Sequence, residues 1–262
     1  MLKYVGFLIV LVLLILGGYY FLQVKQAPAP RDTMSVMEVR GEGANYFENV
    51  QGFYAEPEAP PAGRGDYPGV VMIHEWWGLN DHIRAQAKEL AGEGYRVLAV
   101  DLFGSVATTS DAARAQVGSL DQAKALENLK AAEKYLRERG SQKIASLGWC
   151  FGGGQSLQLA TAAGETLDAT IVYYGNLPTD ERKLRNIRWP VLGIFGETDQ
   201  SISTTSVAKF GETLTRLGIP NSIHVYPGVG HAFANPSNAG FAPAETADAW
   251  AQTLAFLEKN LK

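Results

Sequence analysis

The chain has 262 residues, of which 46% are hydrophobic and 19% are charged, a composition that excludes a disordered or collagen-like protein. Its 23 Lys and Arg against 27 Asp and Glu give a formal net charge of −4, which is not the basic balance of a nucleic-acid-binding protein. The single cysteine excludes both an intrachain disulfide and a cysteine-rich zinc site.

The first residues of the chain predict a membrane segment. Residues 5–22 contain no charged side chain over 18 positions, and a helix of that length is about 27 Å long, close to the hydrocarbon thickness of a bilayer. We expect an uncleaved transmembrane anchor over residues 1–24 and a Pro- and Ala-containing linker over residues 25–37. The alternative is a signal peptide cleaved near Ala27 and Ala29, which would leave a secreted protein. We expect the body, residues 38–262, to be periplasmic or extracytoplasmic.

From residue 38 onward, short apolar runs alternate with longer amphipathic stretches. The expected strands are a hairpin near residues 46–55 and then GVVMIHE, YRVLAVD, KIASLGWC, LDATIVYYG, WPVLGIFGETD and SIHVYPG. The expected helices are DHIRAQAKELAGEG, DQAKALENLKAAEKYLRERG, GGGQSLQLATAAG, residues 203–218 and residues 243–262, and a polar loop is expected before the second of them. This alternation predicts an α/β fold with a mostly parallel sheet and helices on both faces. Ligands of such sheets bind beyond the carboxyl ends of the strands.

The segment IASLGWCFGGGQ places Cys150 in a glycine-framed turn between a strand and a helix. This is the nucleophile-elbow pattern, with cysteine where serine is more common. The helix dipole at this turn favours a thiolate, and the amide of Phe151 is a candidate donor to an oxyanion. Two alternatives are a small buried cysteine and a dinucleotide-binding turn, although the G-x-G-x-x-G spacing is missing.

Two further residues follow Cys150 in the order that this turn predicts, which is nucleophile, acid and histidine. Asp199 follows the strand VLGIF, and His231 follows the strand SIHVY. The histidine would act as base to the thiol and as acid to the leaving group, while the carboxylate would hold its tautomer. Glu197 is a rival for the acidic position.

The end of the first buried strand, MIHEWWG, is a second polar site. Glu75 could take the thiol proton or hold a loop, and the amide of Trp76 is a candidate second oxyanion donor. His74 is expected to be structural.

Together, HEWWGLNDHIR, GWCFGGG, FGETDQSI and GVGHAF resemble the dienelactone hydrolase family of α/β-hydrolases, over nearly the whole body. The resemblance implies an α/β-hydrolase fold, with Cys150 as nucleophile and Asp199 and His231 completing a triad. It also implies that Glu75 helps to activate the thiol, and that the oxyanion amides are those of Trp76 and Phe151. Members of the family hydrolyse enol-lactones and small esters through an acyl-enzyme, without a metal or an organic cofactor.

The chain departs from this family at the residues that hold the substrate. Well-studied members use two arginines to bind a substrate carboxylate, whereas Asn235 stands four positions after His231 and Arg114 has no secure alignment with the second. We expect Trp77, Tyr174 and Asn235 to contact a small ester or lactone substrate. A broad carboxylesterase or thioesterase is the alternative function, and a non-catalytic anchored binding domain is a third. We expect a monomer that contacts the membrane through its N-terminal segment and binds no nucleic acid.

Overall fold

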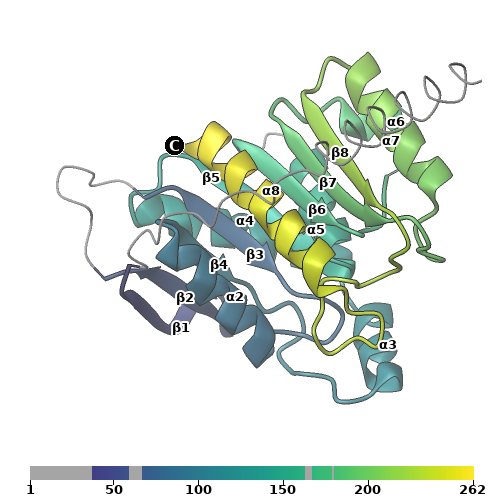
Figure 1. Ribbon diagram of the computed structural model, residues 1–262. Coiled ribbons are helices and arrows are strands. Elements are labelled where there is room, and N and C mark those ends of the chain that lie inside the picture. Colours follow the sequence, from purple (N-terminus) through teal and green to yellow (C-terminus); the bar gives the residue numbers. More distant parts are fainter. Residues whose placement is uncertain (1–36, 59–66, 163–166, 179) are drawn as a thin grey trace, which may run out of the picture. The chain divides into compact units, whose positions relative to one another are not determined.

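The computed structural model describes residues 37–58, 67–162, 167–178 and 180–262. In these residues eight strands form one sheet, in the order β1-β2-β4-β3-β5-β6-β7-β8 (Figure 1). β1 (Val39–Phe47) pairs antiparallel with β2 (Val50–Pro57), and β2 pairs antiparallel with β4 (Arg96–Ala99). Every later pair of neighbours is parallel. The sheet is therefore mixed, with its antiparallel strands at one edge.

The central strands consist of continuous apolar runs because both of their faces are covered. They are β3 (Gly69–Ile73), β5 (Ile144–Trp149), β6 (Ala169–Tyr173) and β7 (Val191–Gly196), and every residue in them is buried. β8 (Asn221–Tyr226) closes the other edge of the sheet and is only partly buried. The carboxyl ends of these parallel strands share one edge of the sheet, which is where the polar residues of the candidate site lie.

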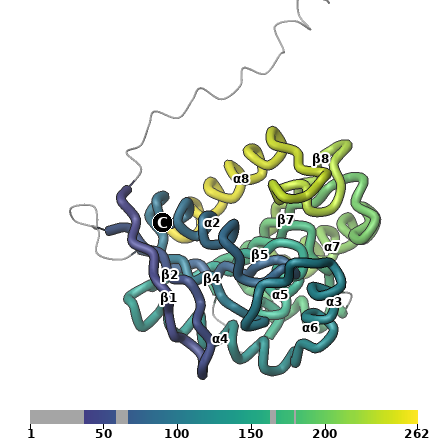
Figure 2. The backbone as a smooth tube through the Cα atoms, turned by 90° about the horizontal axis from the view of Figure 1, so that it is seen from below, coloured from purple at the N-terminus to yellow at the C-terminus, as the bar shows by residue number. Residues whose placement is uncertain are grey.

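Helices cover the two faces of the sheet (Figure 2). Side chains of α2 (Asp81–Gly92) and α8 (Pro243–Leu261) join one buried cluster, and side chains of α4 (Gln122–Glu138), α5 (Phe151–Thr161) and α7 (Thr204–Arg216) join another. Asn80 caps α2 by accepting a hydrogen bond from the amide of Ile83 at 3.1 Å, as is typical of asparagine at this position.

One helix lies where a loop was expected. α3 (Ser110–Gly118) follows β4, and its N-terminus is capped by Thr109, whose side chain accepts from the amide of Ala112. It buries only Ala113, so it lacks the apolar stripe by which an amphipathic helix is recognised in a sequence. The sequence does not predict the short α6 (Glu181–Leu184) for the same reason, because Leu184 is the one side chain that this helix buries.

The predicted fold class is wrong in its membrane part. The transmembrane helix expected over residues 1–24 and the linker as far as residue 36 lie outside the described residues. Within the described part of the chain, none of the helices is long and apolar enough to span a bilayer. The longest of them, α8, contains Glu245, Asp248, Glu258 and Lys259 and buries one face only. The fold supported by the structure is an α/β-hydrolase fold with a mixed sheet, and a preceding membrane helix is not supported.

Candidate active site

Cys150 lies in the sharp turn between β5 and α5. Its φ of 53° and ψ of −115° place a non-glycine residue in the left-handed half of conformational space, a strained arrangement that is typical of functional turns. The flanking glycines make the turn possible. A Cβ added to Gly148 would lie 2.1 Å from the carbonyl oxygen of Gly152, and one added to Gly152 would lie 2.3 Å from that of Ile73.

His231 joins Cys150 to Asp199. Its Nε2 atom lies 3.0 Å from Cys150 Sγ, and its Nδ1 atom lies 2.7 Å from Asp199 Oδ2. The other carboxylate oxygen, Oδ1, accepts hydrogen bonds from the amides of Ser201 at 2.7 Å and Ile202 at 3.0 Å. The structure therefore brings together, from the ends of β5, β7 and β8, the three residues that the sequence placed in one site.

Glu197, the alternative candidate for the acidic residue of the site, does not contact His231. Its carboxylate accepts a hydrogen bond from the amide of Gly228 at 2.9 Å, and its side chain is exposed. Asp199 is the carboxylate that contacts His231.

The electrostatics of the Asp199–His231 contact favour an ion pair. Burial disfavours the charged imidazole, but hydrogen bonds with Asp199 and Cys150 outweigh this and raise the pKa of His231 to about 10. Burial also opposes ionisation of Asp199, yet the hydrogen bonds from His231 and from two backbone amides lower the pKa of its carboxyl group. Hydrogen bonds to the charged form thus prevail over desolvation in both partners.

Glu75 follows β3 and is buried, with 5% of the residue exposed. The side-chain amide of Asn235 donates a short hydrogen bond to its Oε2 atom, and Asn235 Oδ1 in turn accepts from the amide of Ser237 at 2.8 Å. Burial raises the pKa of Glu75 to about 7, although the Asn235 hydrogen bond and the charge of His231 act in the opposite direction. A carboxyl group with this pKa exchanges a proton readily near neutral pH.

A cavity of about 570 Å³ opens above these residues, a size typical of a small-molecule site. Cys150, His231 and Glu75 all line it, together with the residues expected to contact a substrate, Trp77, Tyr174 and Asn235. The ring of Tyr174 meets that of His231 edge-on, with centroids 5.2 Å apart. Trp149, in contrast, packs against Tyr173 in the core with centroids 5.5 Å apart.

The titratable side chains that line the cavity include the carboxyl group of Glu75 and the imidazole of His231. Among the residues that the structure describes, no lysine or arginine lines it. Arg114 is exposed on α3 and pairs with Asp111 at 2.8 Å. The amide of Asn235, expected to contact the substrate, is engaged with Glu75.

Two backbone amides at the cavity have no hydrogen-bond acceptor among the described residues. Phe151 is the first residue of α5, so its N–H group has no partner within the helix, and Trp76 lies in the turn after β3. Within the described ranges neither amide donates a hydrogen bond to a protein acceptor, and both residues line the cavity. Free backbone donors of this kind can hold a developing oxyanion.

Asn238 was not expected at the site. Its side-chain amide donates to the carbonyl oxygens of His231 at 2.8 Å and Ala232 at 3.0 Å, and Ala232 has a positive φ of 57°. Asn238 thus holds the turn that carries the histidine. The sequence contains no signal for this contact, because it arises from the way an irregular loop folds back on itself.

Comparison with known proteins finds relatives over the same region. A sequence model described as "Dienelactone hydrolase family" matches residues 50–261. A Saccharolobus solfataricus protein named "Putative carboxymethylenebutenolidase" is 27% identical over 259 residues, covering 81% of this chain and 95% of that protein. "Protein usf" of Aquifex pyrophilus is 29% identical over 225 residues, covering 81% of this chain and 94% of that protein. The solved structure named "m3DLH" is 26% identical, with a TM-score of 0.77, and covers 86% of this chain and 99% of its own.

Proposed function

The chain belongs to the dienelactone hydrolase family, whose activity is that of a carboxylic ester hydrolase, and we propose that it cleaves uncharged esters or lactones through an acyl-enzyme on Cys150. The observation that carries the proposal is the position of His231, with one ring nitrogen on the thiol sulfur and the other on Asp199. This is the arrangement by which a histidine activates a nucleophile and is itself oriented by an acid.

In the first half of the reaction, the Cys150 thiol gives its proton to His231 Nε2, and Sγ attacks the carbonyl carbon of the substrate. A carbon–sulfur bond forms, and the π electrons move to the carbonyl oxygen, where the amides of Trp76 and Phe151 bind the resulting oxyanion. The tetrahedral intermediate collapses by breaking the carbon–oxygen bond. His231 gives its Nε2 proton to the departing alkoxide, which leaves as an alcohol.

In the second half, water hydrolyses the thioester. Because His231 has given its Nε2 proton to the departing alcohol, its neutral imidazole can accept a proton from water. The hydroxide attacks the thioester carbonyl, the carbon–sulfur bond breaks, the Cys150 sulfur recovers a proton from His231, and the acid is released. The balance is one ester and one water converted to one acid and one alcohol.

Glu75 supplies a second proton acceptor at the thiol. It lines the same cavity as Cys150, and its pKa of about 7 suits a group that takes up the thiol proton near neutral pH. Asn235 holds this carboxyl group by its hydrogen bond and itself lines the cavity.

The charge of the cavity selects the substrate. A carboxylate on the substrate would meet Glu75, and it would find no lysine or arginine among the described lining residues. The imidazole of His231 also lines the cavity, but both of its ring nitrogens are already engaged, with Asp199 and Cys150. Desolvating an unpaired carboxylate is costly, so uncharged acyl esters and lactones are favoured over an acidic dienelactone.

The experiment compares the full-length chain with its Cys150→Ala variant on p-nitrophenyl acetate and on a dienelactone that carries a carboxylate. We expect activity on the acetate ester that the variant lacks, a mass increase of one acetyl group on the peptide containing Cys150, and a much lower kcat/KM for the acidic lactone. Full activity in Cys150→Ala would disprove the cysteine mechanism. A preference for the acidic lactone would overturn the choice of substrate.

A further inference from the structure

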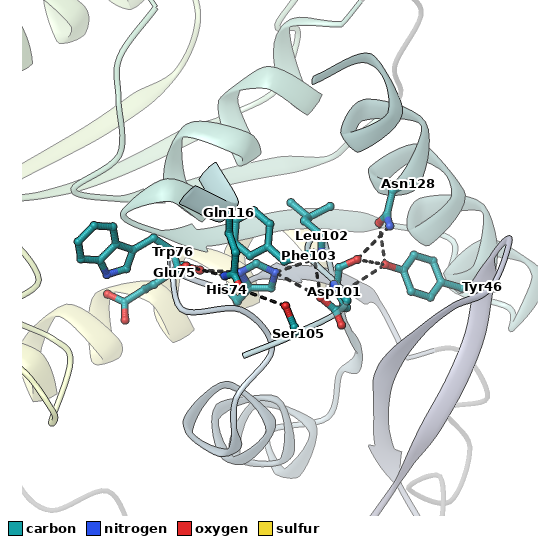
Figure 3. A network of polar contacts seen from close by, with 11 residues as sticks. Tyr46, His74, Glu75, Trp76, Asp101, Leu102, Phe103, Ser105, Gln116 and Asn128 are labelled. Carbon is teal, nitrogen blue, oxygen red and sulfur yellow. Dashed lines mark hydrogen bonds and ion pairs between the residues drawn. The ribbon is translucent and has the colours of Figure 1, made fainter. Parts of the chain in front are cut away.

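His74 is fully buried behind the cavity, directly after β3, and takes no part in the reaction described above. Both of its ring nitrogens are engaged. Nδ1 lies 2.6 Å from the carbonyl oxygen of Glu75, and Nε2 lies 3.1 Å from the amide nitrogen of Leu102. Figure 3 shows the ring between the turn after β3 and the loop after β4.

These partners determine which nitrogen carries the proton. The Leu102 amide can only donate, so Nε2 is the acceptor, and the Glu75 carbonyl can only accept, so Nδ1 carries the hydrogen. Burial lowers the pKa of His74, in agreement with a neutral ring. His74 is therefore a fixed donor to the Glu75 carbonyl.

That carbonyl belongs to the same peptide unit as the amide of Trp76. Because the unit is planar and trans, its C=O and N–H bonds point in opposite directions, and holding the oxygen sets the direction of the N–H. A hydrogen bond accepted at the oxygen also polarises the N–H and makes it a stronger donor. The amide of Gly78 reaches the same oxygen at a longer distance, 3.3 Å.

The ring of His74 also contacts the second candidate oxyanion donor. It stacks on the ring of Phe151, with centroids 6.1 Å apart and an interplanar angle of 19°. Phe103 packs against both rings, at 5.0 Å from each. A Cβ on Gly152 would lie 2.5 Å from the carbonyl oxygen of His74, so the start of α5 is already in tight contact with the backbone that carries the imidazole.

The loop that holds His74 is itself anchored (Figure 3). Asp101 Oδ1 accepts from the amides of Phe103 at 3.0 Å and Gly104 at 2.9 Å. Tyr46, from β1, accepts at its hydroxyl from the Asp101 amide at 3.1 Å and donates to Asn128 Oδ1 at 2.6 Å. The Leu102 amide is thus a rigid support for Nε2 rather than a mobile loop contact.

We propose that His74 is a positioning residue for catalysis, which aligns the two backbone donors of the oxyanion site by hydrogen bonding the Glu75–Trp76 peptide and stacking on Phe151. This inference rests on the proposed function, because it requires an oxyanion formed at Cys150. It predicts that His74 affects the formation of the tetrahedral intermediate and leaves the nucleophilicity of the Cys150–His231 pair unchanged.

Three substitutions separate the contacts of the ring. In His74→Asn the side-chain amide nitrogen stands where Nδ1 stood and can still donate to the Glu75 carbonyl. His74→Gln keeps a polar group only near Nε2, and His74→Phe keeps the ring without either hydrogen bond. His224→Phe is the matched control, since His224 lies on β8, contacts Ser222 and lines no part of the cavity.

Two reactions of Cys150 are then measured in the full-length proteins. Acylation is followed as the burst of p-nitrophenolate from p-nitrophenyl acetate, and it passes through an oxyanion. Alkylation by iodoacetamide uses the same sulfur and forms no oxyanion. Since removal of one oxyanion donor typically costs 10²–10³ in rate, we expect misalignment in His74→Gln and His74→Phe to slow acylation by roughly 10- to 100-fold. We expect alkylation to be unchanged in both variants, and acylation to be largely retained in His74→Asn and in His224→Phe.

The outcomes are distinct. Acylation at the wild-type rate in His74→Gln and His74→Phe overturns the inference and leaves the proposed function intact. A parallel loss of acylation and alkylation also overturns it, because the effect is then damage to the nucleophile. Loss in His74→Asn equal to that in His74→Phe overturns the role of the Nδ1 bond. If the wild-type protein is alkylated but never acylated, the proposed function fails, and the inference fails with it.

Discussion

The side chains of Glu75 and Asn235, 160 positions apart in the chain, are joined by a hydrogen bond from the amide to the carboxyl group. The amide is neutral, so its hydrogen bond lowers the pKa of the buried carboxyl group but stabilises the carboxylate less than an arginine would. The result is a carboxyl group whose pKa is about 7, in a cavity that Cys150 also lines and whose described lining residues include no lysine or arginine.

The first prediction concerns the charge at Asn235. Asn235→Arg places a cation beside Glu75 and in the cavity, so it lowers the pKa of Glu75 and gives a substrate carboxylate a partner. We expect the ratio of kcat/KM for the acidic dienelactone to that for p-nitrophenyl acetate to rise by at least about tenfold. The measurement is the pair of steady-state constants at pH 7. Asn235→Gln, which keeps the amide and adds one methylene, is the control, and an equal rise in that variant would show that charge is not the cause.

A second prediction follows from the buried carboxyl group of Glu75. Its pKa in the folded protein, about 7, lies above the ordinary value of 4.5, so the folded state binds more protons than the unfolded state between these values. Ionised Glu75 therefore lowers the free energy of unfolding. This destabilisation is absent below pH 4.5 and reaches its full size above pH 7. We expect Glu75→Gln to gain stability relative to wild type as pH rises through this window, by roughly 3 kcal/mol in total.

Urea unfolding of both proteins at pH 5 and pH 8 tests this prediction. Comparing the variant with wild type at each pH cancels the contributions of groups that titrate in both proteins. A difference in unfolding free energy that is the same at the two pH values would show that Glu75 is ionised in the folded protein throughout.

The third prediction separates Asp199 from Glu197. Asp199→Asn removes the charge that orients His231 and stabilises its cation, and we expect the acylation rate to fall by about 100-fold or more. Glu197→Gln changes the other acidic residue of the same loop, whose contact is the Gly228 amide, and we expect it to acylate at the wild-type rate. The burst of p-nitrophenolate measures both variants. An equal loss in the two would mean that the loop, rather than the carboxylate on His231, limits the reaction.

The fourth prediction concerns the turn that carries Cys150. A Cβ at Gly152 would lie 2.3 Å from a backbone oxygen of β3, whereas a Cβ at Gly154 meets its nearest atom at 3.6 Å. Since backbone cannot move aside as a side chain does, we expect Gly152→Ala to destabilise the protein by about 3 kcal/mol or more. Gly154→Ala, in the same helix, is expected to be neutral or to stabilise it by about 0.5 kcal/mol. Thermal unfolding of the two variants decides this, and similar midpoints would refute the steric argument.

Much of the site could be predicted from local pattern. The turn at Cys150 can be predicted from the sequence because its glycines, the apolar strand before it and the helix after it are neighbours in the chain. The backbone strain that the glycines permit is also local. Asp199 and His231 could be placed because parallel strands bring their carboxyl ends to one edge of the sheet. Only the contacts of the folded chain showed that Asp199, and not Glu197, reaches His231.

The tertiary structure decided everything that depends on residues distant in the chain or on burial. Asn235, which is expected to contact the substrate, also hydrogen bonds the distant Glu75. His74 belongs to no recognisable sequence motif, yet it connects two loops and both candidate donor amides. The raised pKa of Glu75 arises from desolvation, which no local segment determines. Local sequence therefore determined the strained turn and the order of the reactive groups, because neighbouring residues set backbone geometry. Packing between distant segments determined which groups pair, how they are charged and which way their amides point.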